Sequence, residues 1–113
     1  MTLQTVVELP RFILRAKSVM TEAELDEAKV MIATDPECGD PLEGTGGVRK
    51  VRFAVGNKGK SGGVRIVYYF YNEAIPVFLL TVFAKKDMPN LKKAERNELA
   101  KLTAKLRESY GAK

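Results

Sequence analysis

Three segments rich in β-branched and aromatic residues constrain the fold of this chain more than any other feature. They are residues 48–55, 63–71 and 77–84, and the connections between them, 56–62 and 72–76, contain glycine, asparagine or proline. This composition is typical of strands separated by turns. Connections this short join neighbouring antiparallel strands, because a parallel pair needs a much longer crossover. The sequence therefore predicts an antiparallel meander of three strands.

The regions on either side of the meander are typical of helices, with one short strand at the start. Residues 5–9 predict that strand, and Pro10 ends it and is well placed to begin a helix. Thr21 and Glu24 have the spacing of a capping box, which begins a second helix that ends before Asp35. After Asn90, which can cap a third helix, apolar residues recur along one face: Leu91, Ala94, Leu99, Leu102 and Leu106.

The predicted order is β-α-α-β-β-β-α, an α+β fold with helices packed on the sheet. Residues 1–113 have the length of a single domain, and a hydrophobic content of 45% can supply its core. The single cysteine, Cys38, fits a reducing compartment. The longest apolar run is too short to cross a bilayer, and no secretory signal is visible. We therefore expect a cytoplasmic protein with no membrane partner.

Charge is distributed unevenly along the chain. Residues 1–43 carry four Lys and Arg against nine Asp and Glu, whereas residues 44–86 carry eight basic residues against one acid. A basic surface beside an acidic one attracts a polyanion. The chain contains no histidine, so it lacks the most common general acid–base and the most common metal ligand. Neither a metal nor a cofactor is expected.

The stretch VGNKGKSGG, at residues 55–63, contains the Gly-Lys-Ser that ends a nucleotide-binding P-loop. The first glycine of that motif would stand at position 54, which is Ala54. A P-loop also needs a helix directly after Gly-Lys-Ser, and a strand is expected here. The stretch therefore indicates the tip of a basic hairpin. Lys58 and Lys60 either keep this tip soluble or approach a nucleic-acid backbone.

Three cations of the meander are expected to converge on one patch of the sheet. Lys50 and Arg52 lie on the same face of their strand because side chains alternate, and Arg65 begins the hairpin partner. Between Glu43 and Glu73 there is no acidic residue, although ordinary solvated surfaces mix both signs of charge. Such a patch suits a phosphodiester, and its position on strands makes it preorganised.

Three motifs lie in and beside the meander. They are G-T-G-G-V-R-K-V-R at 44–52, G-K at 59–60 with G-G-V-R-I-V-Y-Y-F at 62–70, and L-L-T-V-F-A-K-K-D at 79–87. Together they resemble the RelE/HigB-type toxins of bacterial type II toxin–antitoxin systems, with the first two close to the HigB branch. The resemblance covers most of the chain from Pro36 to Leu102, and the compact fold of that family agrees with the order of elements predicted above.

The resemblance implies an mRNA interferase that enters the ribosomal A site, cleaves translated mRNA and is held inactive by a cognate antitoxin. The antitoxin is expected to carry a helix-turn-helix DNA-binding domain. In the family, basic residues on the strand before the hairpin loop, at the start of the next strand and at the end of the last strand serve the site. Here these are Lys50, Arg52, Arg65, Lys85 and Lys86. Arg49, Lys58 and Lys60 are expected to assist binding of the RNA backbone or ribosome.

RNA can be cleaved by its own 2′-hydroxyl, which leaves a 2′,3′-cyclic phosphate. The reaction needs a base at that hydroxyl, charge stabilisation at phosphorus and an acid at the leaving 5′-oxygen. Our hypothesis is that Arg52 and Arg65 clamp the phosphate, because a guanidinium matches two phosphate oxygens. Crowding by both arginines would favour a neutral Lys50 as the base. Lys85 or Lys86 would assist the leaving group.

Two alternatives stay open. Some family members use a tyrosine near the start of the last helix, where this chain has Lys92, so a degenerate toxin that acts as a binding partner is one alternative. The other is a non-catalytic RNA- or DNA-binding module, which would display aromatic side chains beside the cations. Tyr68 and Phe70 share a face with core residues, whereas Tyr69 and Tyr71 fit either core or surface.

Overall fold

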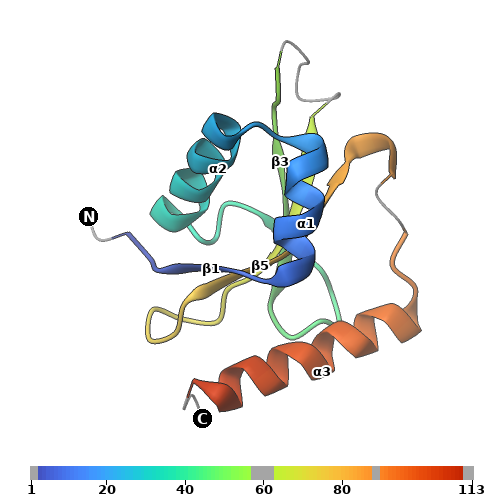
Figure 1. Ribbon diagram of the computed structural model, residues 1–113. Coiled ribbons are helices and arrows are strands. Elements are labelled where there is room, and N and C mark those ends of the chain that lie inside the picture. The colour runs from blue at the N-terminus through green and yellow to red at the C-terminus, as the bar shows by residue number, and fades with distance from the viewer. Residues whose placement is uncertain (1–2, 57–62, 88–89, 111–113) are drawn as a thin grey trace.

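The computed structural model describes residues 3–56, 63–87 and 90–110 (Figure 1). Its elements are β1 (Val6–Glu8), α1 (Pro10–Val19), α2 (Glu22–Thr34), β2 (Asp40–Pro41), β3 (Val48–Phe53), β4 (Val64–Tyr69), β5 (Val77–Ala84), the short 3-10 helix η2 (Lys85–Asp87) and α3 (Lys93–Ser109). This order confirms the predicted α+β fold. Strand β2 was not predicted, because two residues are too few to show any periodicity.

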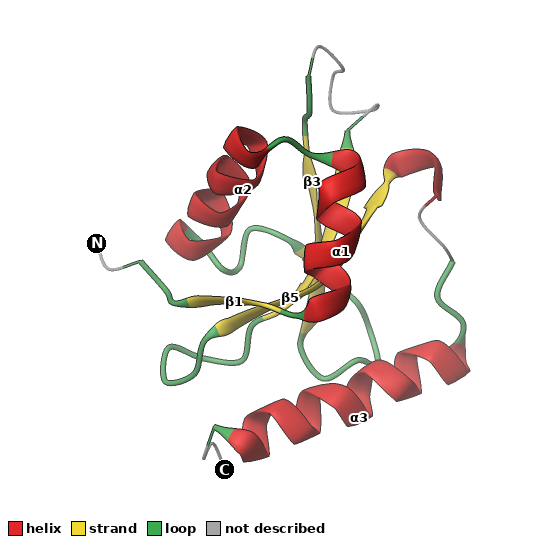
Figure 2. Cartoon of the chain, in the orientation of Figure 1, coloured by secondary structure: helices red, strands yellow, loops and turns green. Residues whose placement is uncertain are grey.

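The strands form one sheet in the order β1-β5-β4-β3-β2 (Figure 2). Strand β4 pairs antiparallel with β3 on one side and β5 on the other, which confirms the meander. Strand β2 pairs antiparallel with the outer side of β3, and β1 pairs parallel with the outer side of β5. The β3–β4 hairpin therefore lies next to a short edge strand.

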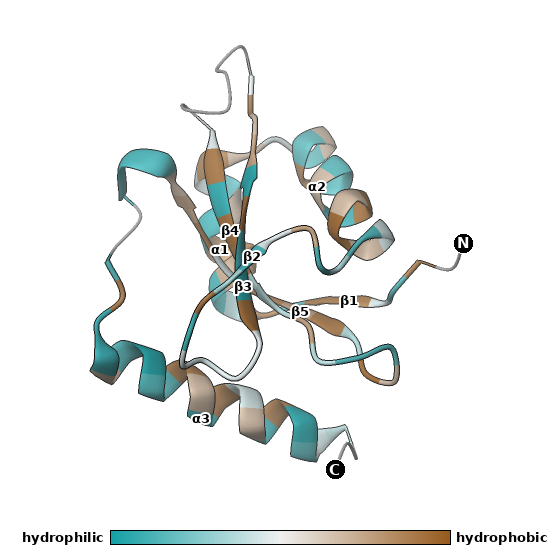
Figure 3. Ribbon diagram, turned by 180° about the vertical axis from the view of Figure 1, so that it is seen from behind, coloured by the Kyte–Doolittle hydropathy of each residue, from teal (hydrophilic) through white to brown (hydrophobic). Residues whose placement is uncertain are grey.

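Helices pack on both faces of the sheet. Helices α1 and α2 bury their apolar side chains on one face, here called the α1 face, in a cluster formed by Phe12, Ala16, Ala28, Ile32, Ile66 and Tyr68 among others. Helix α3 packs on the opposite face, here called the α3 face, against Val48, Val67, Tyr69, Phe78 and Leu80. Figure 3 shows α3 crossing one end of the sheet, away from the hairpin. No helix of the described residues is long and apolar enough to cross a membrane.

Two of the three helix starts predicted from the sequence are confirmed. Helix α1 begins at Pro10. The predicted capping box of α2 is confirmed, because the Thr21 hydroxyl accepts from the Glu24 amide at 3.1 Å and the Glu24 carboxylate accepts from the Thr21 amide at 2.8 Å. The prediction that Asn90 caps α3 is wrong. Lys92 is the cap, and its amide donates to the Glu95 side chain at 3.3 Å.

The G-T-G-G motif holds α3 against the sheet. Thr45 is fully buried, and its carbonyl accepts from the buried hydroxyl of Thr103 at 3.1 Å. Gly46 has φ +76°, and a β-carbon there would lie 2.9 Å from Oγ1 of Thr103. Gly47, at φ +124°, has the Tyr69 ring equally close. Both positions therefore need glycine for the close approach of α3 and the sheet, so the motif has a structural role.

Replacing Thr103 by valine should destabilise the protein. The variant keeps the shape of the side chain and leaves the buried carbonyl of Thr45 without its donor, which should lower the free energy of unfolding by about 1–2 kcal/mol. Chemical denaturation measures this. Thr5→Val is the matched control, since Thr5 is exposed. Equal unfolding midpoints for the Thr103 variant and the wild type would contradict the role of this contact.

Glu24 also joins α2 to the hairpin, because its second carboxylate oxygen accepts from the Gly56 amide at 2.6 Å. The hydrogen bonds from the Thr21 and Gly56 amides lower the pKa of Glu24 below its ordinary value of 4.5. A lowered pKa stabilises the fold above the ordinary value, and this stabilisation is lost as the pH falls through the folded value.

We therefore expect the free energy of unfolding to fall more steeply with acid for the wild type than for Glu24→Gln, which carries no titratable group there. Unfolding measured from pH 6 down to about pH 3 tests this. Glu22→Gln, in the same helical turn, is the matched control, because no hydrogen bond joins its carboxylate to the described residues. Parallel pH profiles for the wild type and Glu24→Gln would refute the contribution of these bonds.

Candidate nucleic-acid interface

Two adjacent rows of side chains cross the α3 face at the hairpin end of the sheet. The pairing of β3, β4 and β5 aligns Lys50 with Val67 and Thr81 in one row, and Arg52 with Arg65 and Phe83 in the next. Directly paired residues project from the same face, and alternate residues along a strand do so as well. We call these two lines of residues the open rows, because Arg52 is exposed, and Lys50 and Arg65 are partly exposed.

The predicted convergence of Lys50, Arg52 and Arg65 is therefore present in the structure. Arg65 lies directly opposite Arg52, and Lys50 is two residues from Arg52 on the same strand. Within the described part of the chain, no carboxylate lies within 4.0 Å of any of the three. Burial, and then the charge of Arg52, lowers the pKa of the Arg65 guanidinium. This patch is a concentration of unneutralised positive charge.

A cleft of about 690 Å³ extends from this patch around the outer edge of β3. Strand β2 pairs only with Arg49 and Lys50, so within the part of the chain that the structure describes the rest of that edge carries no paired strand. Besides the three cations, the cleft is lined by Met31, Cys38, Asp40, Val51, Phe53 and Ala54. Asp40 supplies the one carboxylate among these lining residues, directly across from Lys50. Sequence analysis missed it because β2 has no recognisable pattern.

Cys38 lies in the same cleft but does not have the character of a nucleophile. Burial raises the pKa of its thiol, and its Sγ is 3.7 Å from the hydroxyl of Tyr68. A thiol with a raised pKa stays protonated at neutral pH, and the thiolate is the reactive form. The chemical character of this cleft therefore comes from its cations and not from the cysteine.

Lys85 and Lys86 lie in η2, at the same end of the sheet as the open rows. The Lys85 amide donates to the Gly63 carbonyl at 3.0 Å, and Ala84 pairs with Val64. Both lysine side chains are exposed. The structure therefore places this basic pair one residue beyond the β4–β5 pairing, beside the strand that carries Arg65.

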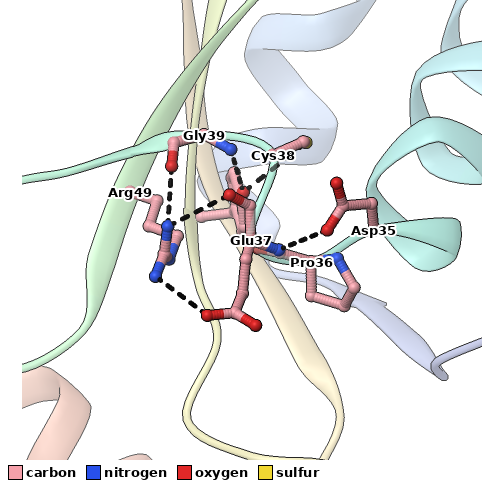
Figure 4. Close-up of polar contacts among 7 residues, drawn as sticks. Asp35, Pro36, Glu37, Cys38, Gly39 and Arg49 are labelled. Atoms are coloured by element: carbon pink, nitrogen blue, oxygen red, sulfur yellow. Dashed lines mark hydrogen bonds and ion pairs between the residues drawn. The ribbon is translucent and has the colours of Figure 1, made fainter.

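Arg49 does not join the other cations. It pairs with Tyr68 across the hairpin and therefore lies on the α1 face, opposite Lys50 and Arg52. Figure 4 shows its guanidinium against the loop that follows α2, where it donates to the carbonyls of Glu37 at 3.2 Å and Gly39 at 2.7 Å. Its Nη2 also lies 3.7 Å from the Glu37 carboxylate. These contacts give Arg49 a structural position. Lys58 and Lys60 lie outside the described residues.

The tyrosines of β4 do not lie beside the cations. Tyr68 is fully buried in the α1-face cluster, with Phe70 packed against it, as predicted. Tyr69 is fully buried under α3, and its hydroxyl accepts from Arg107 at 3.1 Å. Tyr71 has Arg107 over its ring at 5.2 Å. Lys92 caps α3 through its backbone.

An aromatic side chain does lie beside the cations, but on β5. Phe83 is directly opposite Arg65, and the guanidinium carbon of Arg15 lies 4.3 Å from the centroid of its ring. Sequence analysis missed Phe83 because the apolar composition of β5 indicates a core strand on both faces. It missed Arg15 because nothing in a helical sequence shows which sheet residue a side chain will reach.

A second hollow, here called the α3 groove, continues from Phe83 along the sheet to α3 and has a volume of about 720 Å³. Val67, Leu80, Thr81 and Phe83 of the sheet line it together with Leu9, Pro10, Arg11, Leu91, Glu95, Glu98, Leu99 and Leu102. The groove is mostly apolar, whereas the patch beside it is basic. Each hollow takes three of its lining residues from the open rows: the α3 groove takes Val67, Thr81 and Phe83, and the cleft takes Lys50, Arg52 and Arg65.

These features have a consistent chemical meaning. A patch of three cations that form no ion pair within the described residues is suited to bind a phosphodiester and to stabilise the added negative charge of a reaction at phosphorus. Two of the cations are arginines, which can each contact two phosphate oxygens. Among the described residues, no group of three His, Cys, Asp or Glu side chains is arranged to hold a metal ion.

Comparison with known protein families gives a match over residues 13–113 to the RelE toxin of the RelE/RelB toxin–antitoxin system. The matched region includes the whole meander, the cleft beside β3 and α3. It therefore includes every residue of the basic patch and of η2. The chain belongs to the RelE family of toxins of toxin–antitoxin systems.

Proposed function

We propose that this toxin is a ribosome-dependent mRNA interferase that cleaves translated mRNA in the ribosomal A site and is neutralised by a cognate antitoxin. RelE toxins are in general endoribonucleases that act on mRNA during translation, which supports the proposal. The observation that carries it is the direct pairing of Arg52 with Arg65, neither of which forms an ion pair within the described residues. A cytoplasmic location follows from this substrate, since translating ribosomes are there.

The proposed roles follow from position. Arg52 and Arg65 hold the scissile phosphate between two strands, where neither backbone needs to move to meet it. Lys50, in the adjacent open row, takes the proton of the attacking 2′-hydroxyl. Lys85 or Lys86, at the end of β5, assists departure of the 5′-oxygen. The products are a 2′,3′-cyclic phosphate and a new 5′-hydroxyl end.

Two finer assignments stay predictions. The family match is to RelE toxins as a whole, so membership of the HigB-like branch is one of them. The helix-turn-helix domain of the antitoxin is the other, and the sequence of the adjacent reading frame tests it. Arg49, Lys58 and Lys60 remain proposed contacts to RNA or ribosome, although Arg49 would have to act from the α1 face.

Replacing Arg65 by alanine should abolish growth arrest and lower the rate of mRNA cleavage by about 100- to 1000-fold, as expected for one lost donor to the transition state. Arg65→Lys should recover part of this rate, because it restores the charge without the two-pronged contact. Primer extension on translated mRNA measures cleavage, and circular dichroism with thermal unfolding verifies the fold.

Lys105→Ala is the matched control, since it removes one positive charge from an exposed position on α3, outside the patch. It should cleave like the wild type. A folded Arg65→Ala protein with full toxicity would refute the assignment of the site. A wild type that binds RNA but produces no breaks in translated frames would favour the non-catalytic alternatives.

Free RNA should be cleaved slowly or not at all by the purified protein. Without a histidine pair, the site depends on the ribosome to align the 2′-hydroxyl with the phosphate, and alignment of this kind can supply much of a reaction rate. The same transcript, with and without translating ribosomes, provides the comparison. Rapid cleavage of naked RNA would refute dependence on the ribosome while leaving the nuclease assignment in place.

A further inference from the structure

We propose that Thr81 and Phe83 form a base-recognition site of the toxin, in which a nucleobase of the mRNA stacks on Phe83 and Thr81 hydrogen-bonds to its edge. The α3 groove receives this base while its phosphate lies on the cations. The inference rests on the proposed cleavage of mRNA, and it assigns base discrimination to two residues of β5.

The first support is the position of these residues in the open rows. Phe83 is directly across from Arg65, and Thr81 is directly across from Val67, two residues further along β4. Neighbouring strands are about 5 Å apart. A nucleotide whose phosphate contacts Arg65 can therefore place its base over the adjacent strand β5. The patch and the α3 groove divide one face into a place for phosphate and a place for a base.

The second support is a β-bulge directly beside Thr81, which brings Leu80 to the same face of the sheet. Val67 pairs with Thr81, but the next residue of β4, Tyr68, pairs with Leu79, so Leu80 is an extra residue on β5. Leu80 and Thr81 consequently both line the α3 groove although they are consecutive in sequence. Bulges of this kind re-aim side chains and are enriched beside active sites.

The third support is the Thr81 hydroxyl itself. Its Oγ1 is buried, and within the described residues it has no hydrogen-bond partner. A buried hydroxyl without a partner is destabilising, and valine would fill the same volume without that cost. A base edge in the groove would supply the missing partner. Because the hydroxyl both donates and accepts, it can pair with an amino group, a ring nitrogen or a carbonyl.

The fourth support is the preorganisation of Phe83. Arg15 of α1 reaches around the sheet edge, where its Nε donates to the Val82 carbonyl at 2.9 Å while its guanidinium lies over the Phe83 ring. The ring is thereby held before any ligand arrives. Stacking on an aromatic ring accepts every base, so Phe83 supplies affinity, and the Thr81 hydroxyl supplies the discrimination.

The lining of the groove favours a base over the sugar–phosphate backbone. Apart from Arg11, its charged residues are Glu95 and Glu98 of α3, which repel phosphate. Glu95 also caps its helix and Glu98 lies 3.6 Å from Lys101, so neither carboxylate is a strong site for a cation. The apolar leucines around them suit the flat face of a base better than a charged chain.

The test combines cleavage mapping with equilibrium binding, so that it does not depend on activity alone. Thr81→Val and Phe83→Leu are compared with the wild type on translated mRNA, where the bases flanking each cut are counted. The same proteins are titrated with short single-stranded oligoribonucleotides that differ in one base. Thr34→Val is the matched control, since Thr34 bonds within α2, away from the α3 groove.

Thr81→Val should reduce discrimination among bases by roughly fivefold, as for the loss of one neutral hydrogen bond, without lowering the thermal unfolding temperature. Phe83→Leu should weaken binding of all oligonucleotides by roughly tenfold, as for the loss of one stacking contact. If Thr81→Val changes the preference for one base in the binding assay while neither the wild type nor the variants cleave mRNA, the base site is supported and the proposed nuclease function is refuted.

Three results would overturn the base site. One is a Thr81→Val protein with the base preferences of the wild type in both assays. Another is a wild type that binds no oligonucleotide and shows no base preference at its cuts. The third is a Phe83→Leu protein that cleaves and binds RNA normally but escapes neutralisation by the antitoxin, which would assign the α3 groove to a protein segment.

Discussion

The rest of this site depends on the pairing register of β3 and β4, which holds Arg52 against Arg65. Two like charges directly opposite each other destabilise a sheet. The register nevertheless stays fixed, because the other face of the same hairpin pairs Val51 with Ile66 in the core beneath α1 and α2. A slip by one residue would move charged side chains into that core. Apolar packing on the α1 face therefore keeps Arg52 and Arg65 opposite each other on the α3 face, despite the repulsion between their charges.

Helix α3 determines how much of the charged face is accessible. It is attached at the far end of the sheet through Thr103, through Arg107 on Tyr69 and through an Arg96 contact of 2.7 Å to the Glu43 carbonyl. These polar contacts add to the packing of the α3 leucines on the sheet, and among the described residues of the helix Thr103 is the one that is fully buried. The helix thereby forms a wall of the α3 groove and leaves Lys50, Arg52 and Arg65 accessible.

Sequence analysis could predict the features that depend on local chemistry. Alternation on β3 was enough to place Lys50 with Arg52, and the Thr21 capping box began a helix where expected. It could not predict features that depend on pairing between distant segments. The bulge at Leu80 becomes visible only when the residues of β4 and β5 are aligned. Alternation places Arg49 on the face opposite Lys50, but not in contact with the carbonyls of the loop after α2. Phe83 was hidden for the same reason, because only the register shows that it faces a cation.

The contact between Arg15 and Val82 has a consequence for self-association. Strand β5 extends beyond its pairing with β1, and such an edge can recruit a strand from another molecule. Helix α1 packs along β5, and the Arg15 guanidinium occupies the Val82 carbonyl. The side chain that lies over Phe83 thus also takes up a backbone acceptor that an added strand would otherwise use. One arginine therefore bears both on the edge of β5 and on the position of the Phe83 ring.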